Sequence, residues 1–178
     1  RLNNDDLRQG LIERLASANS GIRRRALWMI DRLPLELTQD SRRFAYQVLI
    51  DAGFDEDWWR AARWIREPLR RYEDEDLRER LLAAFRGNDA AASDAALRIL
   101  SLLRKPGFSP EEFPRLRARL LHAVDEDDFQ SFVSLAQTRG MHSQDLVDQL
   151  TERSQRAERE IARRARWALN SLALSLTS

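Results

Sequence analysis

Three short segments of this chain bring arginine and tryptophan together in nearly the same order. They are RRALW at 24–28, RAARW at 60–64 and RRARW at 163–167. A guanidinium forms planar, paired hydrogen bonds with carboxylates and phosphates, and an indole ring offers a flat surface for stacking or apolar contact. The three segments therefore predict sites that bind an anionic group beside an apolar or aromatic one.

Residue types that carry catalysis or hold metals are sparse in this chain. It contains no Cys, which excludes disulfides, thiolate chemistry and Cys-based metal sites. His122 and His142 have no second His at ligand spacing and no plausible Ser or Asp partner. No phosphate-binding loop, dinucleotide fingerprint or nucleophile elbow occurs. We therefore expect a protein that is not an enzyme, with no catalytic residue, metal, cofactor or small-molecule substrate.

The overall composition indicates a folded, helical protein. Of the 178 residues, 43% are hydrophobic and 33% are charged, which is more hydrophobic than disordered chains. Only 6 Gly and 5 Pro occur and β-branched residues are few, which favours helices. Without a signal peptide or an apolar run near 18 residues, the expected location is the cytoplasm. Because the chain opens at Arg1 and not at Met, excision from a longer protein is an open alternative.

The Arg-Trp segments belong to a longer internal repeat. Residues 6–33, 76–103 and 145–172 align without a gap, at offsets of 70 and 69 residues, and share Asp-Leu at the start, Ala at the twenty-first position and Leu at the end. Two further segments match each other at an offset of 71, where DEDW at 55–58 meets EDDF at 126–129. Each half-repeat shows apolar residues at helical spacing, so the unit is a helical hairpin of about 35 residues.

Five such hairpins in succession predict an all-α fold. The expected bounds, within one domain spanning 1–178, are 5–33, 40–71, 74–104, 110–139 and 143–174. About ten helices in antiparallel hairpins of near-equal length are typical of an α-solenoid, in which each hairpin buries its apolar stripe against its neighbours. A plain bundle of six or more helices is the competing fold.

One segment of the first hairpin resembles a known repeat family. Asn19 precedes Ile22-Arg23-x-x-Ala26, which is similar to the turn and second helix of HEAT-like repeats. The later copies depart from that pattern, with Ala92-Ser93 in one and Ala162 in another. The resemblance implies a right-handed α-solenoid whose second helices form the inner, concave wall, and it implies no activity.

The helical rotation of about 100° per residue places the tryptophans away from the expected core. In 20–33, four apolar side chains lie within about 60° of Ala26 and form the expected core stripe, namely Ile22, Met29, Ile30 and Leu33. Trp28 lies on the other side of the helix, beside Arg24. The side chains predicted to line the concave wall and bind the ligand are Trp28, Trp64, Trp167, Arg24, Arg60, Arg63, Arg98 and Arg163.

Two other interpretations of these features remain open. The tryptophans could be fillers packed between adjacent hairpins, since a solenoid helix contacts neighbours on both sides. The acidic runs at 73–76 and 125–128 could indicate a cation site, but both lie where a helix is expected to begin, so capping of free N–H groups is favoured.

Charge separates between the two halves of the hairpins. The expected second helices carry a net charge of +9 and the remainder −8, within a total of +1. Every basic residue except Lys105 is Arg, which suits bidentate contact with carboxylates or phosphates, although a GC-rich bacterial genome would also favour Arg.

The sequence thus favours an interaction scaffold. Its basic, Trp-bearing concave face is expected to bind an acidic protein segment or another domain of the same parent protein. The alternative is a nucleic-acid-binding repeat, with Arg on phosphates and Trp stacked on bases. A HEAT-like DNA glycosylase is a third, less favoured hypothesis, because no matching motif supports it. No membrane contact is expected.

Overall fold

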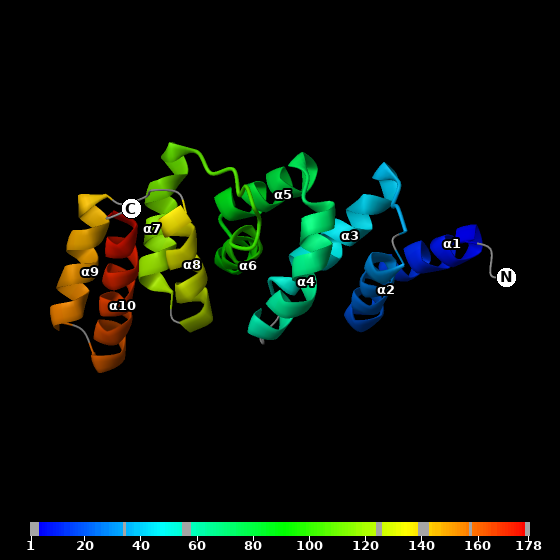
Figure 1. Ribbon diagram of the computed structural model, residues 1–178. Coiled ribbons are helices and arrows are strands. Elements are labelled where there is room, and N and C mark those ends of the chain that lie inside the picture. The colour runs from blue at the N-terminus through cyan, green and yellow to red at the C-terminus, as the bar shows by residue number, and fades with distance from the viewer. Residues whose placement is uncertain are drawn as a thin grey trace. The chain divides into compact units, whose positions relative to one another are not determined.

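A computed structural model describes residues 4–33, 35–54, 58–123, 126–138, 143–156 and 158–176. The described part contains ten α-helices and one short 3-10 helix, and no β-strand (Figure 1). The helices are α1 (Asn4–Leu15), α2 (Ser20–Arg32), α3 (Gln39–Ala52), α4 (Trp58–Tyr72), α5 (Glu75–Arg86), α6 (Ala90–Leu100), α7 (Phe113–His122), α8 (Glu126–Thr138), α9 (Gln144–Arg156) and α10 (Arg159–Leu176). Helix η1 (Pro110–Glu112) leads directly into α7. The predicted all-α class is confirmed.

Consecutive helices pack in pairs, at the positions predicted for the hairpins. The pairs are α1 with α2, α3 with α4, α5 with α6, α7 with α8 and α9 with α10. The chain divides into two compact units, residues 1–107 with the first three pairs and residues 108–178 with the last two. None of the helices in the described part has both the length and the apolar character needed to cross a membrane.

Polar side chains fix where several of these helices begin. The Oδ1 atom of Asn19 accepts a hydrogen bond from the Ile22 N–H at 3.2 Å, ahead of α2. Asp74 caps α5 in the same way, accepting from the Leu77 N–H at 3.0 Å. The capping role predicted for the acidic run at 73–76 is confirmed at Asp74, whereas Asp125 of the second run lies outside the described residues. These caps satisfy N–H groups that a helix start leaves unpaired.

The core face of α2 differs from the predicted stripe. Ala26, Leu27 and Ile30 are buried, but Ile22 and Leu33 are 42% and 41% exposed, so their assignment to the core is wrong. The buried positions centre about 50° from Ala26, toward Leu27. The stripe is rotated because α2 packs against α1, α3 and α4, and Ile22 and Leu33 lie near the two ends of the helix.

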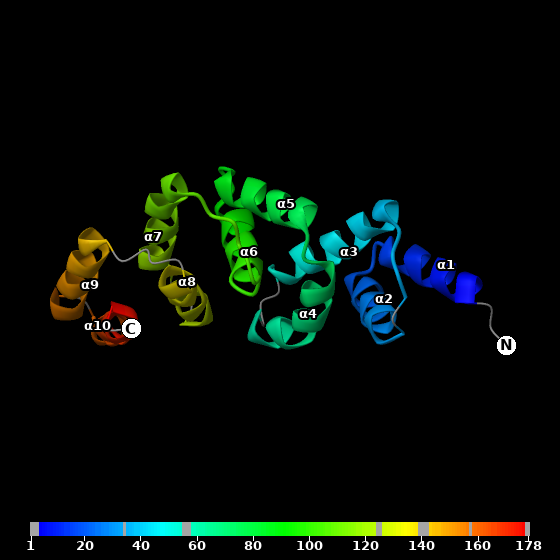
Figure 2. The same ribbon diagram turned by 45° about the horizontal axis from the view of Figure 1, so that its top comes forward.

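In the first unit, the first two hairpins stack in register and the third does not. Helix α1 packs against α3, and α2 against α4 (Figures 1 and 2). Helix α6 packs against α3. Gly53, at the end of α3, permits this approach, because a Cβ built there would lie 2.4 Å from the carbonyl oxygen of Ala95. The row of second helices formed by α2 and α4 therefore does not continue into α6 in the same way.

A polar cluster joins the second hairpin to the third. The Tyr46 hydroxyl of α3 donates a short hydrogen bond to the Asp74 carboxylate, and Arg42 donates to the same carboxylate at 3.3 Å. Burial raises the pKa of Asp74, but the hydrogen bonds from the Leu77 N–H, Tyr46 and Arg42 outweigh it and hold the pKa below the usual Asp value. Burial and the neighbouring carboxylate raise the pKa of Tyr46. The cluster is stable with Asp74 charged and Tyr46 neutral.

The second unit is built around a small apolar core. Helix α10 packs against both α9 and α8, and the buried side chains there include Phe132, Leu146, Leu150 and Ala165. Arg153 of α9 donates a short hydrogen bond to the carbonyl of Leu121, in the last turn of α7. This bond satisfies a carbonyl that the helix end leaves without an intrahelical partner.

Candidate binding groove between α2 and α4

An open groove lies between α2 and α4 in the first unit. Its volume is about 300 Å³, and its lining residues are Arg24, Arg25, Trp28 and Trp64. Trp28 reaches this surface because it follows the buried Leu27 by one residue and so lies about 150° from the centre of the core stripe. We call these four residues the Arg-Trp groove.

Each indole of the groove carries a guanidinium from α2. The Cζ atom of Arg24 lies 4.9 Å from the ring centroid of Trp64, and that of Arg32 lies 5.4 Å from the ring centroid of Trp28. Such cation–π contacts contribute about 0.5 to 1 kcal/mol at exposed sites. They favour the observed orientations of the rings.

The three tryptophans of the Arg-Trp segments differ in how far their side chains are exposed. Trp28 is 51% exposed and Trp167 is 41% exposed, whereas Trp64 is half-buried. The Nε1 atom of Trp64 is itself buried and has no hydrogen-bond partner among the described residues. On its other side Trp64 lines a second pocket of about 230 Å³, which also includes Arg24 and the exposed Phe54. Trp28 is therefore a surface residue, and Trp64 is a half-buried residue that lines both the groove and the second pocket.

Positive charge dominates the walls of the groove. Helices α2 and α4 together contain nine Arg and two acidic residues. Between described residues, Arg23 forms an ion pair with Asp51, Arg70 with Glu67 and Arg71 with Asp31. Arg25 and Arg63 are exposed and form no ion pair with any described residue. An anionic ligand would therefore meet guanidinium groups that are not already neutralised.

The structure brings together some of the predicted ligand-binding residues. Trp28, Trp64 and Arg24 meet in the groove, whereas Arg63 is exposed on α4, next to Trp64 in the sequence, and is not one of the lining residues. The side chain of Arg60 lies outside the described residues. Arg25 was not predicted, although its place in RRALW, next to Arg24 and on the same side of α2 as Trp28, could have indicated it.

The other predicted residues lie elsewhere. Arg98 donates to the carbonyl of Gly53 at 2.7 Å, because α6 packs against α3. In the second unit, the ring of Trp167 lies 6.1 Å from that of Phe129. Arg163 pairs there with Glu126 at 3.1 Å and with Glu160 at 2.6 Å. The hydrogen bond from Arg163 lowers the pKa of Glu160 and raises that of Arg163 itself.

The described part of the chain contains no cluster of metal-ligating side chains. Within that part of the chain, no group of three or more His, Asp or Glu side chains is arranged to hold a metal ion. His122 is exposed at the end of α7, and His142 lies outside the described residues. The expectation that the protein uses no metal or cofactor stays a prediction.

Comparison with known proteins gives no relative from which a function could be transferred. No protein-family model matches the chain, and no curated protein or solved structure is similar enough to it to count as a match. A functional proposal must therefore rest on the geometry and charge of the groove.

Proposed function

We propose that this chain is a protein-binding scaffold and that the Arg-Trp groove holds an acidic segment of its partner. The observation that carries the proposal is the open, positively charged groove between α2 and α4, with an exposed indole at its edge. The acidic segment belongs either to a separate protein or to another domain of the same parent protein.

Recognition would combine charge pairing with one apolar contact. Arg25 and Arg63 would donate to carboxylates of the segment, and Trp28 would cover an apolar side chain between them. The contact of Arg32 with the ring of Trp28 favours one ring orientation and so would reduce the side-chain entropy lost on binding. Arginine and tryptophan are the residue types most enriched among those that dominate binding energies in protein interfaces.

We further propose that the hairpins form a right-handed, HEAT-like solenoid with their second helices on the concave side. The packing of α1 against α3 and of α2 against α4 supports this arrangement for the first two hairpins. The packing of α6 against α3 indicates that the groove is confined to those two hairpins. Trp167 and Arg163 are then a separate candidate surface in the second unit.

Nucleic acid is the second candidate partner, favoured by the excess of Arg over acidic residues on α2 and α4. Stacking of bases requires an accessible ring face, and one face of each indole in the groove already carries a guanidinium. At those faces base stacking would have to displace Arg24 or Arg32, which leaves at most one face of each ring for a base, whereas pairing of carboxylates with the exposed arginines displaces neither. This difference favours the acidic protein segment.

Fluorescence anisotropy with the full chain tests the proposal. The probe is a labelled short peptide in which Asp and Glu alternate with Leu and Phe, and the comparison probes are the same peptide with Lys for every acid, single-stranded DNA and duplex DNA. We expect binding of the acidic peptide alone. The double variant Arg25→Glu with Arg63→Glu should weaken it at least about tenfold, or roughly 1.4 kcal/mol.

The matched control is Arg14→Glu, at an exposed position on α1, which reverses the same charge away from the groove lining. It should change the affinity less than about twofold, because a distant exposed charge is screened by salt. Because Arg14→Glu changes the net charge half as much as the double variant, a loss of binding free energy in the control about half that of the double variant would show that only net charge matters. Tight DNA binding with a logarithmic salt slope of roughly −0.7 to −0.9 per phosphate contacted would instead establish the nucleic-acid function.

A further inference from the structure

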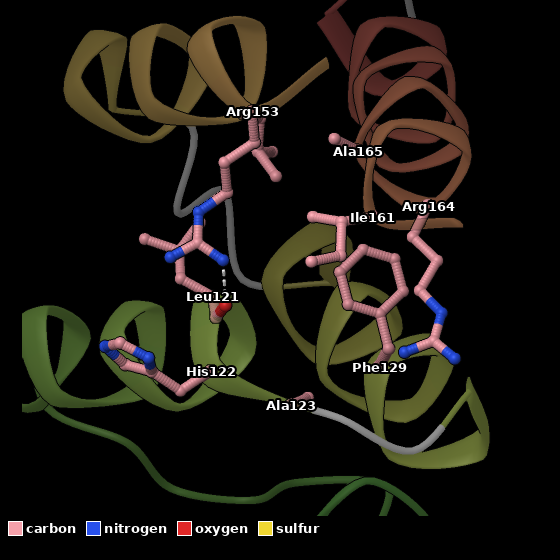
Figure 3. Close-up of a pocket in the computed structure, with 9 residues that line it drawn as sticks. Leu121, His122, Ala123, Phe129, Arg153, Ile161, Arg164 and Ala165 are labelled. Carbon is pink, nitrogen blue, oxygen red and sulfur yellow. Dashed lines mark hydrogen bonds between the residues drawn. The ribbon is translucent and has the colours of Figure 1, made fainter. Parts of the chain in front are cut away.

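The second unit contains an apolar pocket that is separate from the Arg-Trp groove. The pocket has a volume of about 230 Å³ and lies between the α7–α8 and α9–α10 hairpins (Figure 3). Phe129, Leu150 and Ala165 form buried parts of its wall, and Ile161, which is 41% exposed, forms its lip. An exposed branched aliphatic side chain beside an apolar pocket is a surface that a ligand could cover favourably.

The volume limits the ligand to one ring with a short substituent. An apolar cavity of about 150 Å³ is large enough to bind benzene, and pockets for drug-sized ligands begin near 300 Å³. The pocket lies between these values. The apolar wall therefore suits a phenyl ring or a branched aliphatic group of similar size.

One cationic side chain on the wall has no acidic partner. Figure 3 shows the guanidinium of Arg153 on one side of the pocket, with Phe129 and Ile161 on the other. Arg153 donates one N–H to the carbonyl oxygen of Leu121, and its guanidinium forms no ion pair with a carboxylate among the residues that the structure describes. A guanidinium has five N–H donors, so most of the donors of Arg153 are not used by that bond. A half-buried cation without an acidic partner favours an anionic ligand.

The other arginine of the pocket is placed differently. Arg164 lies beyond Phe129 (Figure 3), and its Nε atom is 2.8 Å from a carboxylate oxygen of Glu126. Its charge is thereby balanced within the protein. Among the described residues, Arg153 is therefore the arginine of the pocket without a carboxylate partner, and it lies next to the apolar wall.

From this juxtaposition we infer that the pocket binds a small aryl or branched-alkyl carboxylate. The apolar group would lie between Phe129, Leu150 and Ile161, and the carboxylate would accept hydrogen bonds from Arg153, whose planar fork matches its geometry. The site is formed within the second unit and does not depend on the function proposed for the groove in the first.

The test is a nuclear magnetic resonance titration of the full ¹⁵N-labelled chain with three probes. Phenylacetate carries both ring and charge, benzyl alcohol carries the ring alone, and acetate carries the charge alone. We expect phenylacetate to shift amide signals of the pocket residues with a dissociation constant of about 1 mM, a reasonable affinity for so small a ligand. Benzyl alcohol should bind at least about tenfold more weakly, and acetate should cause no comparable shifts.

Variants then separate recognition from folding. Arg153→Gln should weaken phenylacetate binding at least about tenfold and leave benzyl alcohol unchanged, because it removes only the charge-assisted bonds. Arg166→Gln, at an exposed position of α10, is the matched control and should change neither. If Arg153→Gln fails to fold, Ile161→Glu serves instead: loss of the apolar lip should weaken both probes, and the added carboxylate should weaken phenylacetate several-fold more than benzyl alcohol.

Three results would overturn the inference. The first is equal affinity for phenylacetate and benzyl alcohol, which would mean that Arg153 contributes nothing. The second is a set of shifts that lies outside the α7–α10 pocket. The third is a shift of the pocket signals by an acidic, apolar peptide but not by phenylacetate, which would assign the pocket to a protein partner.

Discussion

Replacement of Trp28 by alanine should cost the fold less than replacement of its buried neighbour. Trp28 is 51% exposed, so about half of a side chain that can bury up to roughly 250 Å² is in contact with protein. At about 25 cal/mol per Å² this corresponds to about 3 kcal/mol. Compactness of the unfolded chain reduces such values by roughly 10 to 40%, and the better helix propensity of Ala returns about 0.5 kcal/mol. The expected loss is therefore about 1.5 kcal/mol.

Leu27→Ala provides the internal comparison. Leu27 is fully buried on the same helix, one residue away, and large-to-small replacements of such side chains cost roughly 2 to 5 kcal/mol. Urea denaturation should be followed by far-ultraviolet circular dichroism, because tryptophan fluorescence changes when Trp28 is removed. If the two units unfold in separate transitions, the transition that Leu27→Ala shifts is that of the first unit, and the two variants are compared on it. The dependence of the unfolding free energy on urea concentration should be the same for both variants.

The same variant should affect binding more than folding. Loss of an aromatic side chain flanked by arginines should weaken binding of the acidic peptide by about 2 kcal/mol or more. If Trp28→Ala lost as much folding free energy as Leu27→Ala, the indole would be a packing residue, and the Arg-Trp groove would not be a surface poised for a ligand. A loss of folding free energy as large as that of Leu27→Ala, together with an unchanged affinity for the acidic peptide, would refute the reasoning altogether.

Three further perturbations follow from the described contacts. Because the folded-state pKa of Asp74 is lowered, the stability that its charge contributes is present above the usual Asp pKa and is lost as the pH falls through the lowered pKa. The melting temperature of Asp74→Asn should therefore depend less on pH, between about 5 and 2, than that of the unaltered chain. Parallel curves of melting temperature against pH would contradict this. Gly53→Ala should destabilise the first unit by about 2 kcal/mol in urea denaturation, since its Cβ would lie 2.4 Å from the Ala95 carbonyl, and an unchanged midpoint would show that α6 does not approach so closely. Asn19→Ala should cost about 1 kcal/mol by the same measurement through loss of the cap on α2, whereas Asn19→Asp should restore most of it.

Local chemistry was sufficient to predict the helices. The repeat of 69 to 71 residues, the apolar spacing and the capping residues place five hairpins at bounds close to those observed, because a helix start depends on groups within a few residues of it. Asn19 and Asp74 illustrate this, since each accepts from an N–H three residues ahead. Two of the three Arg-Trp segments lie on α2 and α4, where Arg24, Trp28 and Trp64 line one groove, and the third lies on α10.

Contacts between helices decided the rest, because they depend on residues far apart in the sequence. The assignment of Ile22 to the core failed since the buried face of α2 is set by α1, α3 and α4 together, which rotates it by about 50° from the position expected for an isolated hairpin. Arg98 shares the periodicity of Trp28, yet it bonds to Gly53 because a missing Cβ lets α6 pack against α3. The apolar pocket beside Arg153 arises between two hairpins, so no pattern within either one could reveal it. Periodicity determines which residues a helix can bury, and the shapes of neighbouring helices determine which of them it does.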